Sequence, residues 1–118
     1  MTEAEARVTT AELRILRWPF SDNDRAQAER STEGLVKVIT NKRGKILGAT
    51  ILGAHAGELI QPWILAISQG LKVSALATMI APYPTLGEAS KRAAGSFYTE
   101  SLFSERTRRI VRFLLKLG

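Results

Sequence analysis

The sequence of 118 residues has no cysteine and a single histidine, His55. Without cysteine, this chain contains no disulfide framework, no thiolate zinc site, no cysteine nucleophile and no dithiol redox centre. One histidine is too few for a zinc site built on two or three imidazoles, so we expect no metal site. Both common glycine-rich phosphate loops, G-x-G-x-x-G and G-x-x-x-x-G-K-[ST], are missing. The chain is therefore not expected to hold a dinucleotide by itself.

Long apolar runs and N-terminal positive charge are also missing. No apolar run approaches the ~20 residues of a membrane-spanning helix. Glu3 and Glu5 make the start too acidic for a signal peptide, so we expect a cytoplasmic protein. Apolar residues form 45% of the sequence, which is enough for the core of one small domain. Acidic residues are scarce at the C-terminal end, where residues 91–118 hold seven basic and two acidic side chains, out of 17 and 11 in the whole chain.

Short β-branched and apolar runs predict strands in the first half of the chain. They lie at Leu13–Trp18, Gly34–Thr40 and Ile46–Leu52. The last two flank a polar turn in which Gly44 supplies a positive φ angle, so they predict a β-hairpin. Gly48 and Ala49 are small enough for another backbone to approach this strand closely. Before the first strand, Thr2 and Glu5 form a capping-box pattern, which predicts a short helix.

Helical periodicity begins after the hairpin. One helix is predicted over residues 57–70, with a proline in its first turn and an apolar stripe made of Leu59, Ile60, Trp63, Ile64 and Ile67. Ser74 is the expected N-cap of a short apolar segment. Thr85 and Glu88 form a second capping box at the start of a further helix. Residues 21–33 are expected to form a polar loop with one helical turn.

A basic amphipathic helix is predicted at the end of the chain, over residues 104–118. One face carries Ile110, Phe113, Leu114 and Leu117, and the opposite face carries Arg108, Arg109, Arg112 and Lys116. Three occupants of the apolar face stay open: this domain or its dimer mate, a membrane surface, or another partner. We expect no nucleic-acid partner, because aromatic residues interleaved with the cations and a known reading motif are both missing.

The segment Ala81–Glu88 concentrates unusual residues in the run A-P-Y-P-T-L-G-E. Two prolines flank Tyr83 and favour an extended backbone around it. The helix that follows Thr85 places Glu88 one turn along, an arrangement that would present a phenol and a carboxylate together. The residues alone favour a structural interpretation, in which a turn precedes a capped helix and Glu88 only supplies the N3 side of the capping box.

Four runs stand in an order and spacing typical of one known domain. They are Gly34–Val38, Gly44–Gly53, Ala56–Ile60 and Tyr83–Glu88. Together they resemble the C-terminal dimerisation domain of the pyridine nucleotide-disulfide oxidoreductases, the family of dihydrolipoamide dehydrogenase, glutathione reductase and mercuric reductase. Asn23–Ala26 fits the same pattern. On this resemblance, residues 1–103 form a dimerisation domain that lacks the first strand of the family, and residues 104–118 form the basic helix.

The resemblance implies an α+β fold, an antiparallel β-sheet with covering helices that forms a twofold homodimer. In that family a His-Pro-Thr-x-x-Glu segment reaches the partner subunit's active site, where the histidine is the acid/base beside the flavin and the glutamate orients it. Pro84, Thr85 and Glu88 match this segment, but Tyr83 stands in place of the histidine. A tyrosine has an ordinary pKa of about 10 against about 6.5 for histidine, so it is a poor base at neutral pH.

The resemblance further implies that this chain is not an enzyme and binds no cofactor alone. Its parent would be an FAD- and NAD(P)H-dependent oxidoreductase that carries the FAD- and NAD(P)-binding domains. Tyr83 and Glu88 are the expected catalytic residues, and Tyr83 and Pro84 are the expected contacts to the FAD of the partner subunit. Mercuric-ion chemistry is not expected from this segment, because no cysteine pair ends the chain. The alternative is a stand-alone interaction or peripheral membrane module that keeps the fold and has no redox chemistry.

Overall fold

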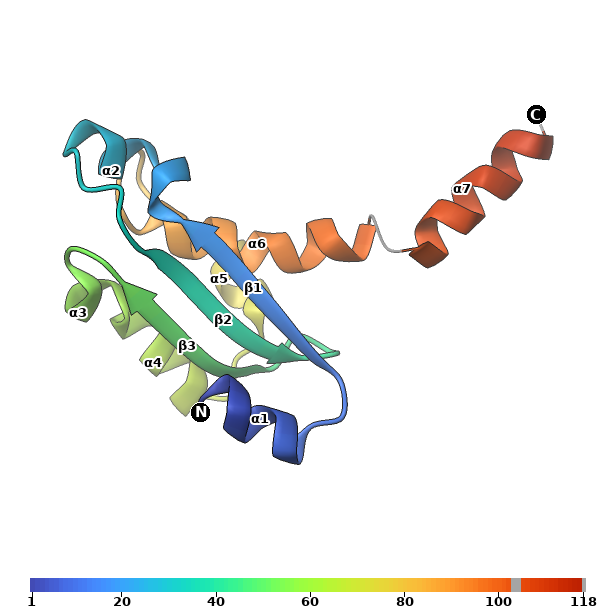
Figure 1. Ribbon diagram of the computed structural model, residues 1–118, viewed down its shortest axis with the longest axis horizontal. Helices are drawn as coiled ribbons and strands as arrows, with labels where there is room; N and C mark the ends of the chain where they lie inside the picture. The colour runs from blue at the N-terminus through green and yellow to red at the C-terminus, as the bar shows by residue number, and fades with distance from the viewer. Residues whose placement is uncertain (103–104, 118) are drawn as a thin grey trace.

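The computed structural model describes residues 1–102 and 105–117, in which an antiparallel sheet is covered by helices (Figure 1). The strands, in the order β1-β2-β3, are β1 Leu13–Pro19, β2 Leu35–Asn41 and β3 Ile46–Leu52. Leu16 of β1 lies opposite Val38 of β2, and Ile39 of β2 lies opposite Gly48 of β3. The α+β fold class and the three predicted strands are confirmed.

The predicted hairpin between β2 and β3 is confirmed. Asn41 builds its turn, because the side-chain Oδ1 accepts hydrogen bonds from the backbone N–H groups of Arg43 and Lys45, both at 2.9 Å. Gly44 adopts a φ of 90°, which residues with a Cβ rarely tolerate. On β3, a methyl group at Gly48 would overlap the backbone carbonyl of Met1. The predicted close approach of another backbone to this strand therefore occurs, and the N-terminus makes it.

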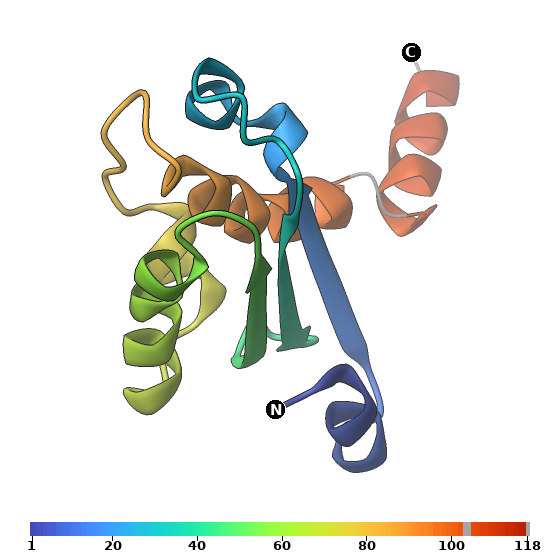
Figure 2. The ribbon, with the colours of Figure 1, turned by 60° about the vertical axis from the view of Figure 1, so that its left-hand side comes forward.

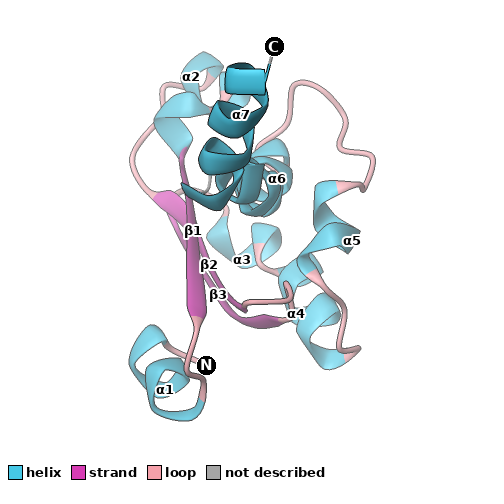
Figure 3. Cartoon of the chain, turned by 90° about the vertical axis from the view of Figure 1, so that its right-hand side faces the viewer, coloured by secondary structure: helices cyan, strands magenta, loops and turns pink. Residues whose placement is uncertain are grey.

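Helices cover one face of the sheet (Figure 3). They are α3 Ala56–Leu59, α4 Gln61–Ser68, α5 Val73–Ala77 and α6 Glu88–Leu102. Small side chains let α6 approach the sheet closely, and Ala89, Ala93 and Ala94 are fully buried. Trp63 of α4 is also fully buried, and its indole Nε1 donates to the Oγ of Ser90 at 2.9 Å. This bond satisfies the buried indole N–H and joins α4 to α6 inside the core.

The N-terminal helix α1, Glu3–Thr9, contacts the other face of the sheet. Thr2 caps it through the predicted capping box, which is confirmed. The carboxylate of Glu3 lies 2.7 Å from the Nζ of Lys37 on β2. Because side chains alternate along a strand, Lys37 projects from the face opposite to the buried Val38. This ion pair therefore ties α1 to the side of the sheet that the other helices leave uncovered.

The single helix predicted over residues 57–70 is wrong, because the chain forms two helices there. α3 ends and α4 begins at Ile60. Pro62 has no N–H to donate to the carbonyl of Glu58, and its ring crowds that carbonyl, so one continuous helix cannot pass through it. Pro62 is instead accommodated in the first turn of α4.

The predicted apolar stripe divides between core and surface. Trp63 is buried, whereas Ile64 and Ile67 are 58% and 40% exposed. Leu65 and Leu71 are exposed to a similar degree, at 61% and 41%. This stretch therefore presents an apolar surface that its own domain does not cover.

The prediction that Ser74 caps the next helix is also wrong. Lys72 is the N-cap residue of α5, and no side chain caps this helix. The reason lies in the tertiary structure: the backbone N–H of Val73 donates to the carbonyl of Gly44 at 2.8 Å, and the side chain of Val73 is fully buried. A first-turn N–H that is satisfied by the hairpin turn needs no side-chain cap.

Between β1 and β2 the structure contains more helix than the expected loop with one helical turn. The elements there are η1 Phe20–Asp22 and α2 Asp24–Ala28. Phe20 and Ala26 are buried, so this segment belongs to the core rather than to a solvated loop.

The last helix, α7, covers Glu105–Leu117 and extends away from the sheet (Figure 1). The predicted helix start at Ser104 lies outside the described residues, as do the side chains of Arg108 and Leu117. Within the described part of the chain, no helix is long and apolar enough to cross a membrane.

Candidate functional site

A protruding loop between α5 and α6 carries the segment Ala81–Glu88 (Figure 2). Its outer side chains face solvent: Ile80 is 94% exposed and Tyr83 is 72% exposed. The peptide bond between Tyr83 and Pro84 is cis, and Pro84 is exposed as well. The phenol of Tyr83 and the ring of Pro84 thus form an uncovered apolar tip beside the sheet.

The phenol of Tyr83 is held by a carboxylate. Its hydroxyl donates a hydrogen bond to the Oδ2 of Asp24 at 2.8 Å. That bond, the negative charge of Asp24, partial burial and the charge of Glu88, in decreasing order, raise the pKa of Tyr83 above its ordinary value of 10.0. The partner of the phenol is therefore Asp24 and not Glu88. With its hydrogen donated to Asp24, the phenol oxygen offers a further ligand an acceptor.

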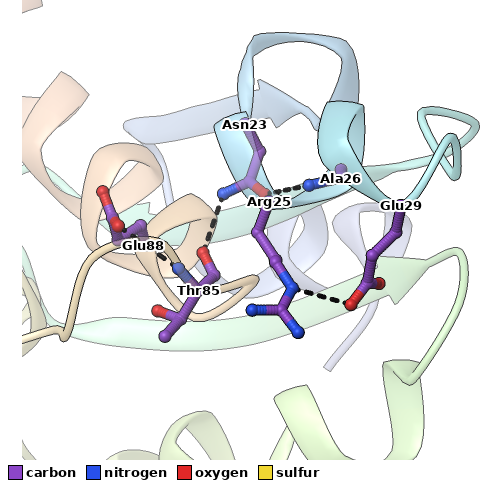
Figure 4. Close-up of polar contacts among 6 residues, drawn as sticks. All are labelled: Asn23, Arg25, Ala26, Glu29, Thr85 and Glu88. Atoms are coloured by element: carbon purple, nitrogen blue, oxygen red, sulfur yellow. Dashed lines mark hydrogen bonds and ion pairs between the residues drawn. The ribbon is translucent and has the colours of Figure 1, made fainter.

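Asn23 fixes the loop to α2 (Figure 4). Its side chain is only 4% exposed. The Oδ1 accepts from the backbone N–H of Ala26 at 2.9 Å and so caps α2, while the Nδ2 donates to the backbone carbonyl of Thr85 at 3.1 Å. The Asn23–Ala26 run therefore holds the loop at two points, with Asn23 bonded to Thr85 and Asp24 bonded to Tyr83.

The start of α6 contains half of the predicted capping box. The backbone N–H of Thr85 donates to the Oε1 of Glu88 at 3.4 Å (Figure 4). The hydroxyl of Thr85 instead donates to the carbonyl of Pro82 at 2.6 Å. The side-chain half of the box is wrong because this local bond within the loop takes the hydroxyl away from the helix N-terminus. Glu88 is half-buried in the first turn, where the helix dipole favours its charge.

Two adjoining hollows lie between this loop, β1 and α6. The smaller, of about 170 Å³, is lined by Asp22, Asp24, Tyr83, Glu88, Arg92 and Trp18. The larger, of about 540 Å³, shares Trp18, Glu88 and Arg92 with it and adds Lys91. The buried indole Nε1 of Trp18 has no hydrogen-bond partner among the described residues. Trp18 is half-buried and packs against the core, so it lies between core and hollow.

A shallow hollow of about 320 Å³ on the loop is lined by both His55 and Pro84. Arg25 and Glu29, which form an ion pair at 2.7 Å, line the same hollow. Within residues 1–102 and 105–117, no group of three or more His, Cys, Asp or Glu side chains is placed to hold a metal ion.

Sequence reasoning missed Asp24, which bonds to Tyr83, and His55, which lines a hollow with Pro84. Asp24 lies 59 residues before Tyr83, so no local pattern joins them. His55 has no periodic or spacing relation to the loop. The one signal available was the Asn23–Ala26 run, which fits the family pattern. The run by itself does not indicate that it contacts the loop.

The family described as "Pyridine nucleotide-disulphide oxidoreductase, dimerisation domain" matches residues 1–94. This chain belongs to that family. The relationship predicted from the four sequence runs is confirmed, and the pyridine nucleotide-disulphide oxidoreductase dimerisation domain ends before α7 begins.

Two similar proteins illustrate the family. The chain is 37% identical over 102 residues to the mitochondrial dihydrolipoyl dehydrogenase of Pisum sativum, a match that covers 86% of this chain and 20% of that protein. It is 39% identical over 98 residues to the leghemoglobin reductase of Glycine max, with coverage of 82% and 19%. The chain thus spans about a fifth of the length of the curated relatives that it matches.

Solved structures have the same fold. LpdA from Mycobacterium tuberculosis superimposes with a TM-score of 0.74 at 26% identity, over 81% of this chain and 21% of that one. The HOCl-induced flavoprotein disulfide reductase RclA from Escherichia coli superimposes with a TM-score of 0.76 at 27% identity, over 80% and 22%. These findings favour the dimerisation domain of a flavoprotein disulfide oxidoreductase over a stand-alone module without redox chemistry.

Proposed function

We propose that this chain is the dimerisation domain of a larger FAD- and NAD(P)H-dependent oxidoreductase, in which it joins two subunits about a twofold axis. Two observations support this proposal. The family match covers residues 1–94, and the similar reductases are about five times as long as the part that matches this chain. Because the chain has no dinucleotide loop, the FAD and NAD(P) sites would belong to other domains of the same parent. By itself the chain would have no activity. A cytoplasmic location fits a sequence without cysteine.

The exposed apolar surface of α4 and the turn that follows it is our candidate for the twofold contact. It is formed by Ile64, Leu65, Ile67 and Leu71, which are between 40% and 61% exposed. Contiguous apolar residues that the domain itself leaves uncovered mark interaction sites. A twofold axis buries the same patch on both subunits, so one patch per domain is enough for the contact.

Sedimentation of the chain tests this contact. We expect a dimer at micromolar concentration and a monomer for Leu65→Asp, because the substitution would bury a charge twice at the axis. Val8→Asp is the matched control, since Val8 is 86% exposed on α1, outside both the α4 surface and the loop. A wild-type chain that stays monomeric would contradict the assignment.

The site proposal rests on one observation: Tyr83 is exposed at the tip of a loop that Asn23 and Asp24 hold in place. The family resemblance implies that this loop meets the flavin of the partner subunit. An exposed aromatic ring beside an exposed proline fits contact with a flat ring system, so the residues present suit that role. FAD would supply the electron transfer from NAD(P)H.

Within that site the side chains have different tasks. The raised pKa of Tyr83 keeps its phenol protonated at neutral pH, so it does not act as the general base that a histidine would provide. Tyr83 would contact the flavin with its ring and with the acceptor oxygen, and Pro84 would pack beside it. Glu88 is a positioning residue that holds the backbone N–H of Thr85.

Kinetics of the full-length parent test the site. Tyr83→Phe is expected to change the flavin absorbance spectrum and the rate of flavin reduction or reoxidation, because the phenol oxygen is removed from its contact. Ile80→Gln is the control on the same loop. If Tyr83→Phe leaves both the spectrum and the rates unchanged, the loop has only a structural role. If Leu65→Asp in the parent loses the dimer and keeps an unchanged flavin spectrum, the loop of the partner subunit does not contact the flavin.

A further inference from the structure

Helix α7 is the part of the molecule that the dimerisation domain does not explain. The family match ends at residue 94, and α7 covers Glu105–Leu117. The helix extends away from the sheet and its covering helices (Figures 1 and 2). Five large apolar side chains of its described part are exposed by 49–74%: Ile110, Val111, Phe113, Leu114 and Leu115. The domain therefore leaves the apolar side of α7 uncovered.

Apolar and cationic side chains lie on opposite sides of α7. Ile110, Phe113 and Leu114 follow the spacing of three and four residues that places side chains on one face of a helix. Arg112 and Lys116 follow the same spacing on the other side. All five of these side chains are exposed. The helix therefore has an apolar face and a basic face at the same time.

The positive charge of α7 distinguishes between the possible partners of its apolar face. Residues 105–117 hold five basic residues and one acidic residue, whereas residues 1–102 hold twelve and ten. A second copy of α7 would bring two strongly basic helices together, which like-charge repulsion opposes. The rest of the domain has little net charge to offer a basic helix. An anionic lipid surface satisfies both faces, since its acyl chains accept the apolar side chains and its phosphates attract the cations.

We propose that α7 binds the surface of an anionic membrane and lies in the plane of the headgroups. Its thirteen residues make a helix about 20 Å long, with the apolar side chains turned toward the acyl chains. Arg112 and Lys116 face the lipid phosphates. The dimerisation domain is carried at the membrane surface, and in a twofold dimer two copies of α7 would bind the same surface, which strengthens attachment. This role is independent of the flavin site.

Vesicle flotation of the 118-residue chain tests the proposal. The probes are vesicles of phosphatidylglycerol and phosphatidylcholine in equal parts, and vesicles of phosphatidylcholine alone. The chain is expected to float with the anionic vesicles, to float far less with the neutral ones, and to be released by high salt because screening weakens the attraction. Failure to float with anionic vesicles at low salt would overturn the proposal.

Two pairs of substitutions locate the binding surface. Phe113→Gln with Leu114→Gln removes the apolar face and keeps a good helix former, and each change is expected to lower vesicle partitioning at least about tenfold. Arg112→Gln with Lys116→Gln removes two positive charges, and the loss of each is expected to lower vesicle partitioning about fivefold. Ile80→Gln and Arg43→Gln are the matched controls, because both side chains are exposed outside α7.

Several outcomes would overturn the proposal. Equal flotation of the α7 variants and the wild type would place the lipid contact elsewhere. Loss of the dimer in Phe113→Gln with Leu114→Gln, measured by light scattering without vesicles, would assign the apolar face to a second copy of the chain. A lower unfolding temperature of these variants without vesicles would show that α7 packs on its own domain instead.

Discussion

The side-chain amide of Asn23 bonds to the backbone of Thr85, 62 residues further along the chain, at 3.1 Å. The same amide caps α2 through its oxygen, which accepts from the N–H of Ala26 at 2.9 Å. One buried side chain thus sets the start of a helix and the position of the loop that carries Tyr83. The loop is exposed at its tip and fixed at its base, which is the arrangement that an interface contact requires.

Two substitutions at Asn23 separate these tasks. Asn23→Ala removes the cap and leaves the carbonyl of Thr85 without its donor, so we expect a loss of about 2–3 kcal/mol in the free energy of unfolding. Asn23→Ser keeps a capping oxygen and loses the donor to Thr85 without adding a charge, so a loss of about 1 kcal/mol is expected. Urea denaturation measures both. Equal losses for the two variants would show that the bond to Thr85 contributes nothing.

The contact between Tyr83 and Asp24 predicts the titration of the phenol. In a Tyr98→Phe background Tyr83 is the remaining tyrosine, and its ultraviolet absorbance should titrate at a pH above the ordinary value of 10.0. Asp24→Asn should lower this pKa, because the negative charge that opposes ionisation of the phenol is gone. Asp22→Asn is the control, since Asp22 lines the same hollow without bonding to Tyr83 in the described structure. An unchanged titration in Asp24→Asn would refute the contact.

The ion pair that ties α1 to the sheet predicts a loss of stability in acid. The hydrogen bonds from Lys37 and Arg7 lower the pKa of Glu3 from 4.5 to about 2. Because the pKa is lower in the folded state, the contribution of Glu3 to stability is present above pH 4.5 and disappears as the pH falls toward about 2. Glu3→Gln should therefore destabilise the chain at neutral pH and have little effect near pH 2.

Urea denaturation of Glu3→Gln and the wild type across this pH range measures that difference. Glu12→Gln is the control, because Glu12 meets Lys42 at 3.6 Å in a pair exposed to solvent on both sides, and such pairs contribute little. A gap between Glu3→Gln and the wild type that stays constant from neutral pH to acid would contradict the proposed role of the ion pair.

Local patterns predicted the sheet well. The β-branched runs of β2 and β3 with Asn41 and Gly44 between them specify a hairpin through turn chemistry that acts over a few residues. The small residue Gly48 correctly indicated a close backbone contact, although the sequence did not identify Met1 as its source. Pro62 was ambiguous, because a proline in the first turn of a helix and a proline that ends one have the same local sequence.

The sequence by itself determined the family, the three strands, the capped α1 and the basic C-terminal helix, because each depends on neighbours along the chain or on runs in a fixed order. Only the tertiary structure decided which groups surround Tyr83. Asp24 rather than Glu88 bonds the phenol, and Asn23 holds the carbonyl of Thr85 while Glu88 holds its N–H. Hydrogen bonds across 59 and 62 residues depend on how two loops pack against each other, and that packing has no local signature in the sequence.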